Sequence, residues 1–401
     1  MSELRKRESR VPVVVVEGSL NGLGVVRSLS HGRMPIYVVD TSRFCAAGWS
    51  RLCTFVRVPS LEGPQLIDSL VELGSKLKSR PVLILTGDGC VDAVSSNRQK
   101  IQSLFRISLP SEETLQALAD KSRFQELARR QGFDIPRGAS LEGTEDLKRL
   151  EDLRLPLILK PANKKLVLAK SVERAVRAMT LSEAKSAAMR MLANAPEIIV
   201  QEWVDGPDSE IFFSLFSCDG DGNIVGIFTG RKVVCSPPGI GNTAICIAAP
   251  EEAAELQALV SRFVATVGYR GLGSIEFKRD RKTRRFVMIE PTVGRTDWQE
   301  EIATFCGVNL PLITYWTVLG TPSSSTVSAG RRVAWRSSIE HRIPSGALRP
   351  GTSVVDGVFR LSDPLPAVYF YVLERFASRI LAQLAFLFHG SNRRSERREL
   401  A

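Results

Sequence analysis

The chain has 401 residues, of which 44% are hydrophobic and 24% are charged, with a formal net charge of +11. This composition excludes a disordered or collagen-like chain, and the length suffices for two or three globular domains. The seven cysteines show no paired spacing and the three histidines are dispersed, which argues against a disulfide framework and a zinc site.

The first 118 residues show the pattern of a small doubly wound α/β domain. Three apolar, largely β-branched runs are typical of buried parallel strands: Val11–Val16, Ile36–Asp40 and Pro81–Leu85. A glycine turn, Gly18–Gly24, follows the first run and leads into a helix, which opens a βαβ unit. Its glycines do not follow the GxGxxG spacing, so a dinucleotide-dependent oxidoreductase is an alternative with weak support. Thr86-Gly-Asp88 ends the third run, at the edge where such sheets bind ligands.

Helices and short strands alternate through the middle of the chain. We expect helices over 111–131, with Ser111 as N-cap, over 170–193 and over 251–267. We expect strands over 156–160, 198–204, 211–216 and 224–229. Lys160 ends the first of these strands, where a lysine is costly unless an anion neutralises it. The acidic stretch Asp219–Asn223 lacks the glutamate of a calcium loop, so we interpret it as a hairpin turn.

A hairpin with two facing glutamates is predicted between Gly271 and Glu290. One face of its strands is apolar, formed by Ile275, Phe277, Val287 and Ile289. Glu276 and Glu290 fall on the other face, and their midpoint is Thr283 in the charged turn. They would then lie opposite each other, about 4.5–5.5 Å apart at Cβ. Carboxylates that close repel unless a cation separates them, and a hard ion such as Mg²⁺ suits their oxygens and carries phosphates. Two solvated glutamates are the alternative.

The order of these features resembles the ATP-grasp superfamily of carboxylate–amine ligases. The ordered set is Lys121, Lys160, Gln201-Glu-Trp-Val204, Glu276 and Glu290, and the match covers about residues 12–320. A carboxylate–amine ligase-like subgroup is supported by three segments: Thr86-Gly-Asp88, Gly230-Arg-Lys232 and Ile289–Arg295. The resemblance implies an α/β ATP-grasp fold with a Rossmann-like pre-ATP-grasp domain over 1–118 and an ATP-grasp domain over 119–320. The latter would divide into a small lobe, 119–204, and a large lobe, 205–320, followed by a C-terminal extension, 321–401.

The resemblance also implies ATP and Mg²⁺ (or Mn²⁺) as cofactors and gives residues their roles. ATP would be held by Lys121 and Lys160 at the phosphates, by Glu202, Trp203 and Val204 at the adenine, and by Asp208 or Glu210 at the ribose. The metal ligands would be Glu276, Glu290 and, where the superfamily usually has asparagine, Thr292. The γ-phosphate and the forming acyl phosphate would be held by Arg231, Lys232 and Arg295, for which arginine's planar fork is suited.

The implied reaction joins a small-molecule carboxylate to an amine through an acyl phosphate and releases ADP and phosphate. Modification of a cell-surface polysaccharide or peptide is one setting, and homodimers are common in the family that the chain resembles. Two departures support an alternative, a catalytically silent ATP-binding homologue. These are Thr292 itself and a segment after Lys160 that lacks the usual glycines.

The C-terminal extension is basic, with 12 arginines and six acidic residues between positions 321 and 401. Residues 367–388 are strongly apolar, but Glu374, Arg375 and Arg379 argue against a transmembrane helix. Packing against the core and peripheral contact of 367–398 with an anionic membrane are the two interpretations. The charged N-terminus predicts no signal peptide, so we expect a cytoplasmic protein, with the inner membrane face as a further location. Nucleic-acid binding would rest on net charge alone and is not expected.

Overall fold

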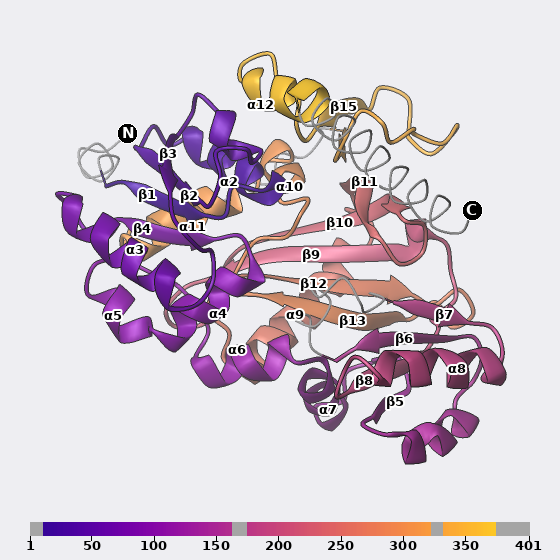
Figure 1. Cartoon of the computed structure of the whole chain (residues 1–401). Coiled ribbons are helices and arrows are strands. Elements are labelled where there is room, and N and C mark those ends of the chain that lie inside the picture. Colours follow the sequence, from indigo (N-terminus) through magenta and orange to yellow (C-terminus); the bar gives the residue numbers. More distant parts are fainter. Residues whose placement is uncertain (1–10, 163–174, 322–331, 374–401) are drawn as a thin grey trace, which may run out of the picture.

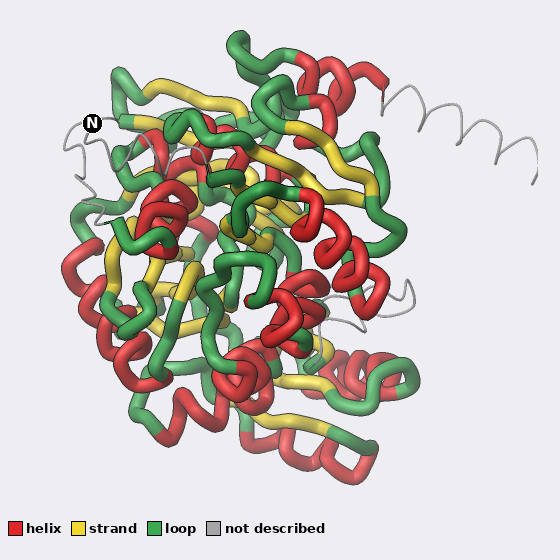
Figure 2. The backbone as a smooth tube through the Cα atoms, turned by 90° about the vertical axis from the view of Figure 1, so that its left-hand side faces the viewer, coloured by secondary structure: helices red, strands yellow, loops and turns green. Residues whose placement is uncertain are grey.

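The computed structural model describes residues 11–162, 175–321 and 332–373, which form three sheets (Figure 1). A four-stranded parallel sheet lies at the N-terminal end of the molecule, a seven-stranded sheet crosses its middle, and a four-stranded antiparallel sheet lies at the opposite end. Figure 2 shows the helices around these strands. The predicted α/β class is confirmed.

The N-terminal sheet has the strand order β3-β2-β1-β4. Its strands are β1 (Val13–Val16), β2 (Ile36–Asp40), β3 (Thr54–Arg57) and β4 (Val82–Leu85). Its helices are α2 (Leu20–Ser30), η1 (Ala47–Trp49), α3 (Gly63–Lys76), α4 (Asp88–Ser96) and α5 (Arg98–Gln102). All four residues of β1 are fully buried, as expected for β-branched residues in a parallel strand covered on both faces. Strand β3 was not predicted, because its residues are half-exposed and do not form an apolar run in the sequence.

The glycines between Gly18 and Gly24 serve close packing. Helix α2 already begins at Leu20, so two of them lie inside it. A Cβ on Gly22 would come within 2.2 Å of the Glu17 carbonyl oxygen. A Cβ on Gly24 would lie 3.3 Å from the Glu300 carboxylate. These contacts account for the glycines without a dinucleotide.

The antiparallel sheet has the order β5-β8-β6-β7 and belongs to the small lobe. Its strands are β5 (Gly138–Leu141), β6 (Leu157–Pro161), β7 (Val176–Ala178) and β8 (Ile198–Glu202). The helical segments are α6 (Glu112–Ala119), α7 (Lys121–Arg130), η2 (Thr144–Asp152) and α8 (Leu181–Leu192). Alanines and aliphatic side chains of α8 and the strands form a separate core under this sheet.

Two predicted helices in this region are wrong in extent. The helix expected over 111–131 is broken at Asp120, which is extended and accepts a hydrogen bond from the Arg123 N–H as the N-cap of α7. Ser111 caps α6 as predicted, accepting from the Thr114 N–H. The stretch expected as one helix over 170–193 contains β7 before α8, and residues 163–174 lie outside the described part of the chain.

The central sheet has the order β13-β12-β9-β10-β11-β14-β15. Its strands are β9 (Ile211–Cys218), β10 (Ile224–Ser236), β11 (Asn242–Ala248), β12 (Gly271–Arg279), β13 (Phe286–Val293), β14 (Val333–Arg336) and β15 (Ser353–Asp356). The helical segments are η4 (Asp208–Glu210), α9 (Ala253–Val267), α10 (Glu301–Phe305), α11 (Leu310–Val318), α12 (Leu365–Val368) and the π-helical η5 (Tyr369–Leu373). The turn predicted over 219–223 is confirmed, with Asp219 accepting from the Asn223 N–H.

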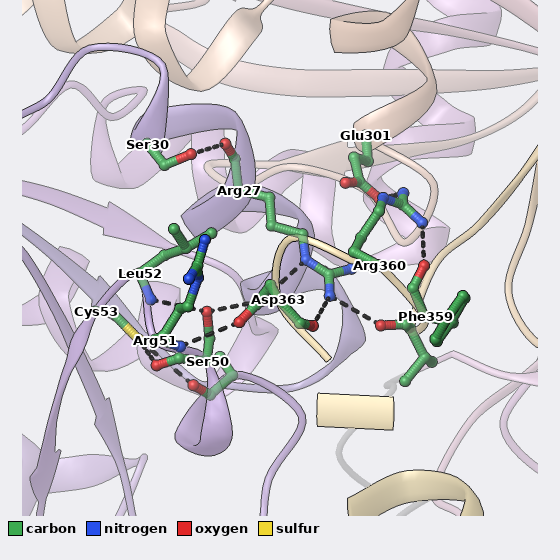
Figure 3. A network of polar contacts seen from close by, with 12 residues as sticks. Arg27, Ser30, Ser50, Arg51, Leu52, Cys53, Glu301, Phe359, Arg360 and Asp363 are labelled. Atoms are coloured by element: carbon green, nitrogen blue, oxygen red, sulfur yellow. Dashed lines mark hydrogen bonds and ion pairs between the residues drawn. The ribbon is translucent and has the colours of Figure 1, made fainter. Parts of the chain in front are cut away.

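Two strands of the C-terminal extension complete the central sheet, and a buried ion pair fastens the extension to the N-terminal domain. The Arg27 guanidinium of α2 pairs with Asp363 at 3.3 Å, and these side chains are 7% and 1% exposed. It also donates to the carbonyls of Gly357 and Val358, both at 2.8 Å. Asp363 in turn accepts from the Ser50 hydroxyl at 2.9 Å (Figure 3). No helix within the described ranges is long and apolar enough to cross a bilayer.

Candidate active site

A pocket opens between the small lobe and the central sheet, with side chains from β6, β8, β10, β12 and β13 in its walls. Residues 239–241, between β10 and β11, and Asn242, the first residue of β11, close one side. Seven of the predicted site residues line it: Lys160, Glu202, Trp203, Val204, Lys232, Glu276 and Glu290. Positions from about 160 to 290 in the chain are therefore brought into one cavity.

The two glutamates pair across the hairpin as predicted, but its apolar face differs from the prediction. Phe286 and Met288 are buried in the core with Ile275 and Phe277. Val287 instead pairs with Lys278, and Ile289 lines the pocket. Glu276 on β12 is the register partner of Glu290 on β13, so their side chains meet across an antiparallel pair. A bulge directly after Glu276 shifts the register of the remaining pairs. The Lys232 ammonium, from β10, lies 2.6 Å from one Glu276 carboxylate oxygen. Burial is the largest single effect and opposes the charge on Lys232, but Glu276, together with Cys235 and Asp297, raises the pKa of this amine above its ordinary value.

The carboxylate pair fits a Mg²⁺ ion that arrives with phosphates. Mg²⁺ is commonly bound by one or two carboxylates together with substrate phosphates rather than by an all-protein cage. Within the described ranges, no group of three or more His, Cys, Asp or Glu could hold a metal unaided. Thr292 lies two residues beyond Glu290 on β13 but is not part of the pocket lining. The donor set in the pocket is thus Glu276 and Glu290.

We expected the backbone amides of Glu202, Trp203 and Val204 to bind the adenine, but two of the three already donate to carbonyls of the small lobe. The Glu202 N–H donates to the Arg137 carbonyl at 2.7 Å, and the Trp203 N–H donates to the Pro156 carbonyl at 2.9 Å. Both amides are therefore used by the small-lobe sheet. The Glu202 carboxylate is bound by the Arg154 guanidinium at 2.8 and 3.0 Å. Of the three linker amides, only that of Val204 makes no hydrogen bond to the described residues.

Lys278 is a pocket residue that the sequence analysis missed. Its ammonium lies 4.2 Å from the centroid of the Trp203 ring, and the Arg177 guanidinium lies 4.4 Å from the same ring. Burial lowers the pKa of Lys278, although Asp208 and Glu276 act in the opposite direction. It lies two positions after Glu276 on the same strand, so both side chains point to the same face, and this alternation was the available signal.

The two ribose candidates have structural partners instead. Asp208 accepts from the N–H groups of Cys235 and Gly239, each at 2.8 Å. Glu210 pairs with Arg279 at 2.5 Å and with Arg284 at 3.3 Å. Neither carboxylate lines the pocket. Asp208 therefore orders the loop that closes the pocket, and the expectation that either residue contacts a ribose has no support in this geometry.

Two further predicted residues also lie outside the pocket lining. Lys121, at the start of α7, donates to the Pro161 carbonyl at 3.5 Å, next to the end of β6. Arg231 precedes Lys232 on β10, and successive side chains of a strand point to opposite faces. Lys232 lines the pocket and Arg231 does not, so the predicted role of Arg231 at the γ-phosphate has no support in this geometry.

Arg295 lies at the carboxyl edge of the N-terminal sheet. Its guanidinium pairs with Asp88 at 2.6 Å and donates to the Thr296 carbonyl at 2.9 Å. Beside it, Glu17 directly follows β1 and has a positive φ of 78°, which is unusual for a residue other than glycine. Burial raises the pKa of Glu17, and Arg295 partly offsets this. Strand order reverses between β1 and β4, so these groups flank the point where doubly wound sheets bind ligands.

Comparisons with known proteins extend this description. No protein-family model matches the chain. A D-aspartate ligase from Enterococcus faecium (strain Aus0004) is 21% identical over 326 residues, which is 76% of each protein.

Among solved structures, N5-carboxyaminoimidazole synthetase from Staphylococcus aureus matches with a TM-score of 0.62 at 13% identity, over 79% of this chain and 80% of that one. The biotin carboxylase domain of Hydrogenobacter thermophilus 2-oxoglutarate carboxylase, solved with MgADP, matches with a TM-score of 0.61 at 15% identity, over 78% and 71%. The α/β fold with a parallel N-terminal sheet and antiparallel sheets is thus the ATP-grasp fold, and the sequence is distantly similar to that of D-aspartate ligase.

Proposed function

We propose that this protein is an ATP-dependent carboxylate–amine ligase that forms an amide bond and releases ADP and phosphate. One observation carries the proposal: Glu276 and Glu290 face each other on adjacent strands and open on the pocket that also holds Lys160 and the linker. Two hard oxygen donors beside a cation at a strand end are suited to the triphosphate of a metal-bound nucleotide.

The pocket divides into two chemical ends. Val204 offers an N–H to the base, and next to it lies Trp203, whose ring contacts the Lys278 ammonium and the Arg177 guanidinium. At the other end, Lys160 neutralises phosphate charge, and Glu276 and Glu290 would hold Mg²⁺, which supplies charge neutralisation at the phosphates when bound. Lys232, fully charged and fixed by Glu276, lies where it can stabilise the transferred phosphoryl group.

The reaction follows from these charges. An oxygen of the substrate carboxylate attacks the γ-phosphorus while the bond to the β,γ-bridging oxygen breaks, which gives an acyl phosphate and ADP. The amine nitrogen then attacks the acyl carbon, inorganic phosphate leaves, and the nitrogen loses its proton. The protein contributes positioning and electrostatic stabilisation, and no covalent enzyme intermediate is required.

An amino acid is the substrate class that we favour for the carboxylate or the amine. A distant relative of this chain is a D-aspartate ligase. The carboxyl edge of the N-terminal sheet offers both a cation, Arg295, and the carboxylates of Glu17 and Asp88, so it could receive a molecule with both charges. A homodimer and a role in modifying cell-surface polysaccharide or peptide remain predictions from the family resemblance.

The test measures ADP release from Mg²⁺-ATP with pools of amino acids and amino sugars. We expect release that requires one acid and one amine, that is lost in Glu290→Gln, and that persists in Glu255→Gln, an exposed glutamate of α9. Calorimetry of ATP binding runs in parallel. ATP binding without release from any pool would instead favour the silent homologue, for which the position of Thr292 outside the pocket is the supporting observation.

A further inference from the structure

The last helical segment of the described chain, α12 with η5, is apolar on every side. Its inner side chains, Ala367, Phe370 and Tyr371, pack against the core that joins the N-terminal domain to the central sheet. Its outer side chains are apolar as well: Leu365, Val368 and Val372 are 49%, 46% and 57% exposed. A helix that is apolar all round is normally covered all round.

Neighbouring segments enlarge this exposed face. Leu361, in the loop that leads into α12, is 87% exposed, and Phe44, from the N-terminal domain, is 67% exposed. The Phe44 ring lies 5.9 Å from that of Tyr369, whose hydroxyl donates to the Phe44 carbonyl at 2.9 Å. We call Phe44, Leu361, Leu365, Val368 and Val372 the apical surface, since α12 lies at the outer end of the molecule in Figure 1.

Exposed arginines lie beside the apical surface, and the nearest exposed acid in the described chain, Glu340, follows Ile339, whose N–H donates to the Tyr371 hydroxyl on the inner side of η5. Asp363 is the only acidic residue over 357–373, and it is buried against Arg27. Arg43 and Arg51, in the loop that carries Phe44, are exposed. An apolar face bordered by exposed arginines complements an anionic lipid surface, whereas two copies of this face would bring like charges together.

The sequence that follows continues the same chemistry. Residues 374–401 lie outside the described part, but they contain six arginines and three glutamates, and 380–388 is almost wholly apolar. Apolar residues together with clustered arginines are the composition of segments that attach proteins to anionic membranes, where each cation adds to the attraction. We propose that the apical surface is a membrane-docking face that binds an anionic bilayer, which would bring the ligase to a membrane surface.

Flotation of the full-length protein with lipid vesicles tests this proposal. The probes are vesicles of phosphatidylcholine alone and of an equal mixture of phosphatidylcholine and phosphatidylglycerol. We expect binding to the mixed vesicles only, and binding that weakens as salt is added. Replacing Val368 and Val372 together by aspartate should reduce the bound fraction at least about tenfold, since it removes apolar insertion and adds repulsion.

The control is Met189→Asp, which places the same charge on an equally exposed apolar residue of the small lobe, 47% exposed. It should bind vesicles like the unchanged protein, and ATP binding by calorimetry should be intact in all variants. Failure of the unchanged protein to float with anionic vesicles would overturn the proposal, and light scattering would then show whether a second copy covers the face. Equal binding of the double aspartate variant would overturn it too, because the apical surface would not be the binding face. Either result leaves the ADP-release test of the ligase untouched.

Discussion

Replacing Glu300 by glutamine should make the free energy of unfolding depend less on pH between about pH 5 and about pH 8. Glu300 is completely buried beside α2, where one of its oxygens accepts from the Ser28 hydroxyl at 2.9 Å and from the Thr304 hydroxyl at 3.2 Å. The other oxygen has no hydrogen-bond partner among the described residues. Burial, with the nearby Glu301 adding to it, raises the pKa of Glu300 to about 8.

The sign of the effect follows from proton binding. A carboxyl with a raised pKa holds its proton in the folded protein over a range in which the unfolded chain, with an ordinary pKa near 4.5, has lost it. The free energy of unfolding therefore falls as the pH rises through this range. Each pH unit costs at most about 1.4 kcal/mol, so the loss between about pH 5 and about pH 8 is at most roughly 4 kcal/mol.

Glutamine cannot titrate, so the free energy of unfolding of the glutamine variant should not show this fall with rising pH. Its amide places an N–H beside the unpartnered position, which lowers stability by about 1–3 kcal/mol at every pH. Urea unfolding of both proteins between pH 5 and pH 8 measures the difference. We expect the glutamine variant to be less stable at pH 5 and to gain on the unchanged protein as the pH rises. The Ser28→Ala variant keeps the Glu300 carboxyl, so its free energy of unfolding should still fall as the pH rises. If the free energy of unfolding of Glu300→Gln falls with pH as steeply as that of the unchanged protein, the reasoning is refuted.

Three further predictions concern the pocket and the C-terminal ion pair. Lys278→Met should weaken ATP binding by about tenfold in calorimetry if this buried amine contacts the nucleotide, and unchanged affinity would remove it from the site. Trp203→Ala should reduce ATP affinity by about 1–2 kcal/mol through lost apolar and cation–π contact, and a Phe substitution should restore most of it. Arg27→Met leaves Asp363 buried without its partner and should lower the free energy of unfolding by about 3–5 kcal/mol, whereas a change below about 1 kcal/mol would show that water reaches the carboxylate.

Strands were predictable where their side chains were buried on a fixed period. The valines of β1 identified a buried parallel strand, and the symmetric spacing about Thr283 placed Glu276 opposite Glu290. The bulge beside this pair left no signal in the sequence, so the core residues of β13 are Phe286 and Met288 and not the predicted Val287 and Ile289. The break at Asp120 could have been foreseen, because aspartate is a common N-cap and Lys121 then begins a new helix. The half-exposed strand β3 offered no comparable pattern.

The site was less predictable because acidic residues of similar spacing perform different tasks. Asp208 and Glu210 lie in a segment rich in polar residues, and only the fold shows that one orders a loop and the other binds Arg279. Lys278 looked like part of a charged turn, yet β12 extends to Arg279 and carries it into the pocket. Ion pairs between residues far apart in the sequence, such as Arg154 and Glu202, cannot be predicted from the residues around either one.

The seven-stranded sheet draws its last two strands from residues near the C-terminus, and this has a consequence for how the protein is made. On the ribosome, β11 is synthesised long before β14, so its outer edge stays open until residue 336 has emerged. The ion pair between Arg27 and Asp363 forms later still, because Asp363 is synthesised after the other residues that bind Arg27, Gly357 and Val358. An open, apolar strand edge is a template for pairing between chains. The growing chain is therefore most exposed to aggregation in the interval after β11 and before β14 has emerged, and chains shortened before β14 should accumulate as aggregates.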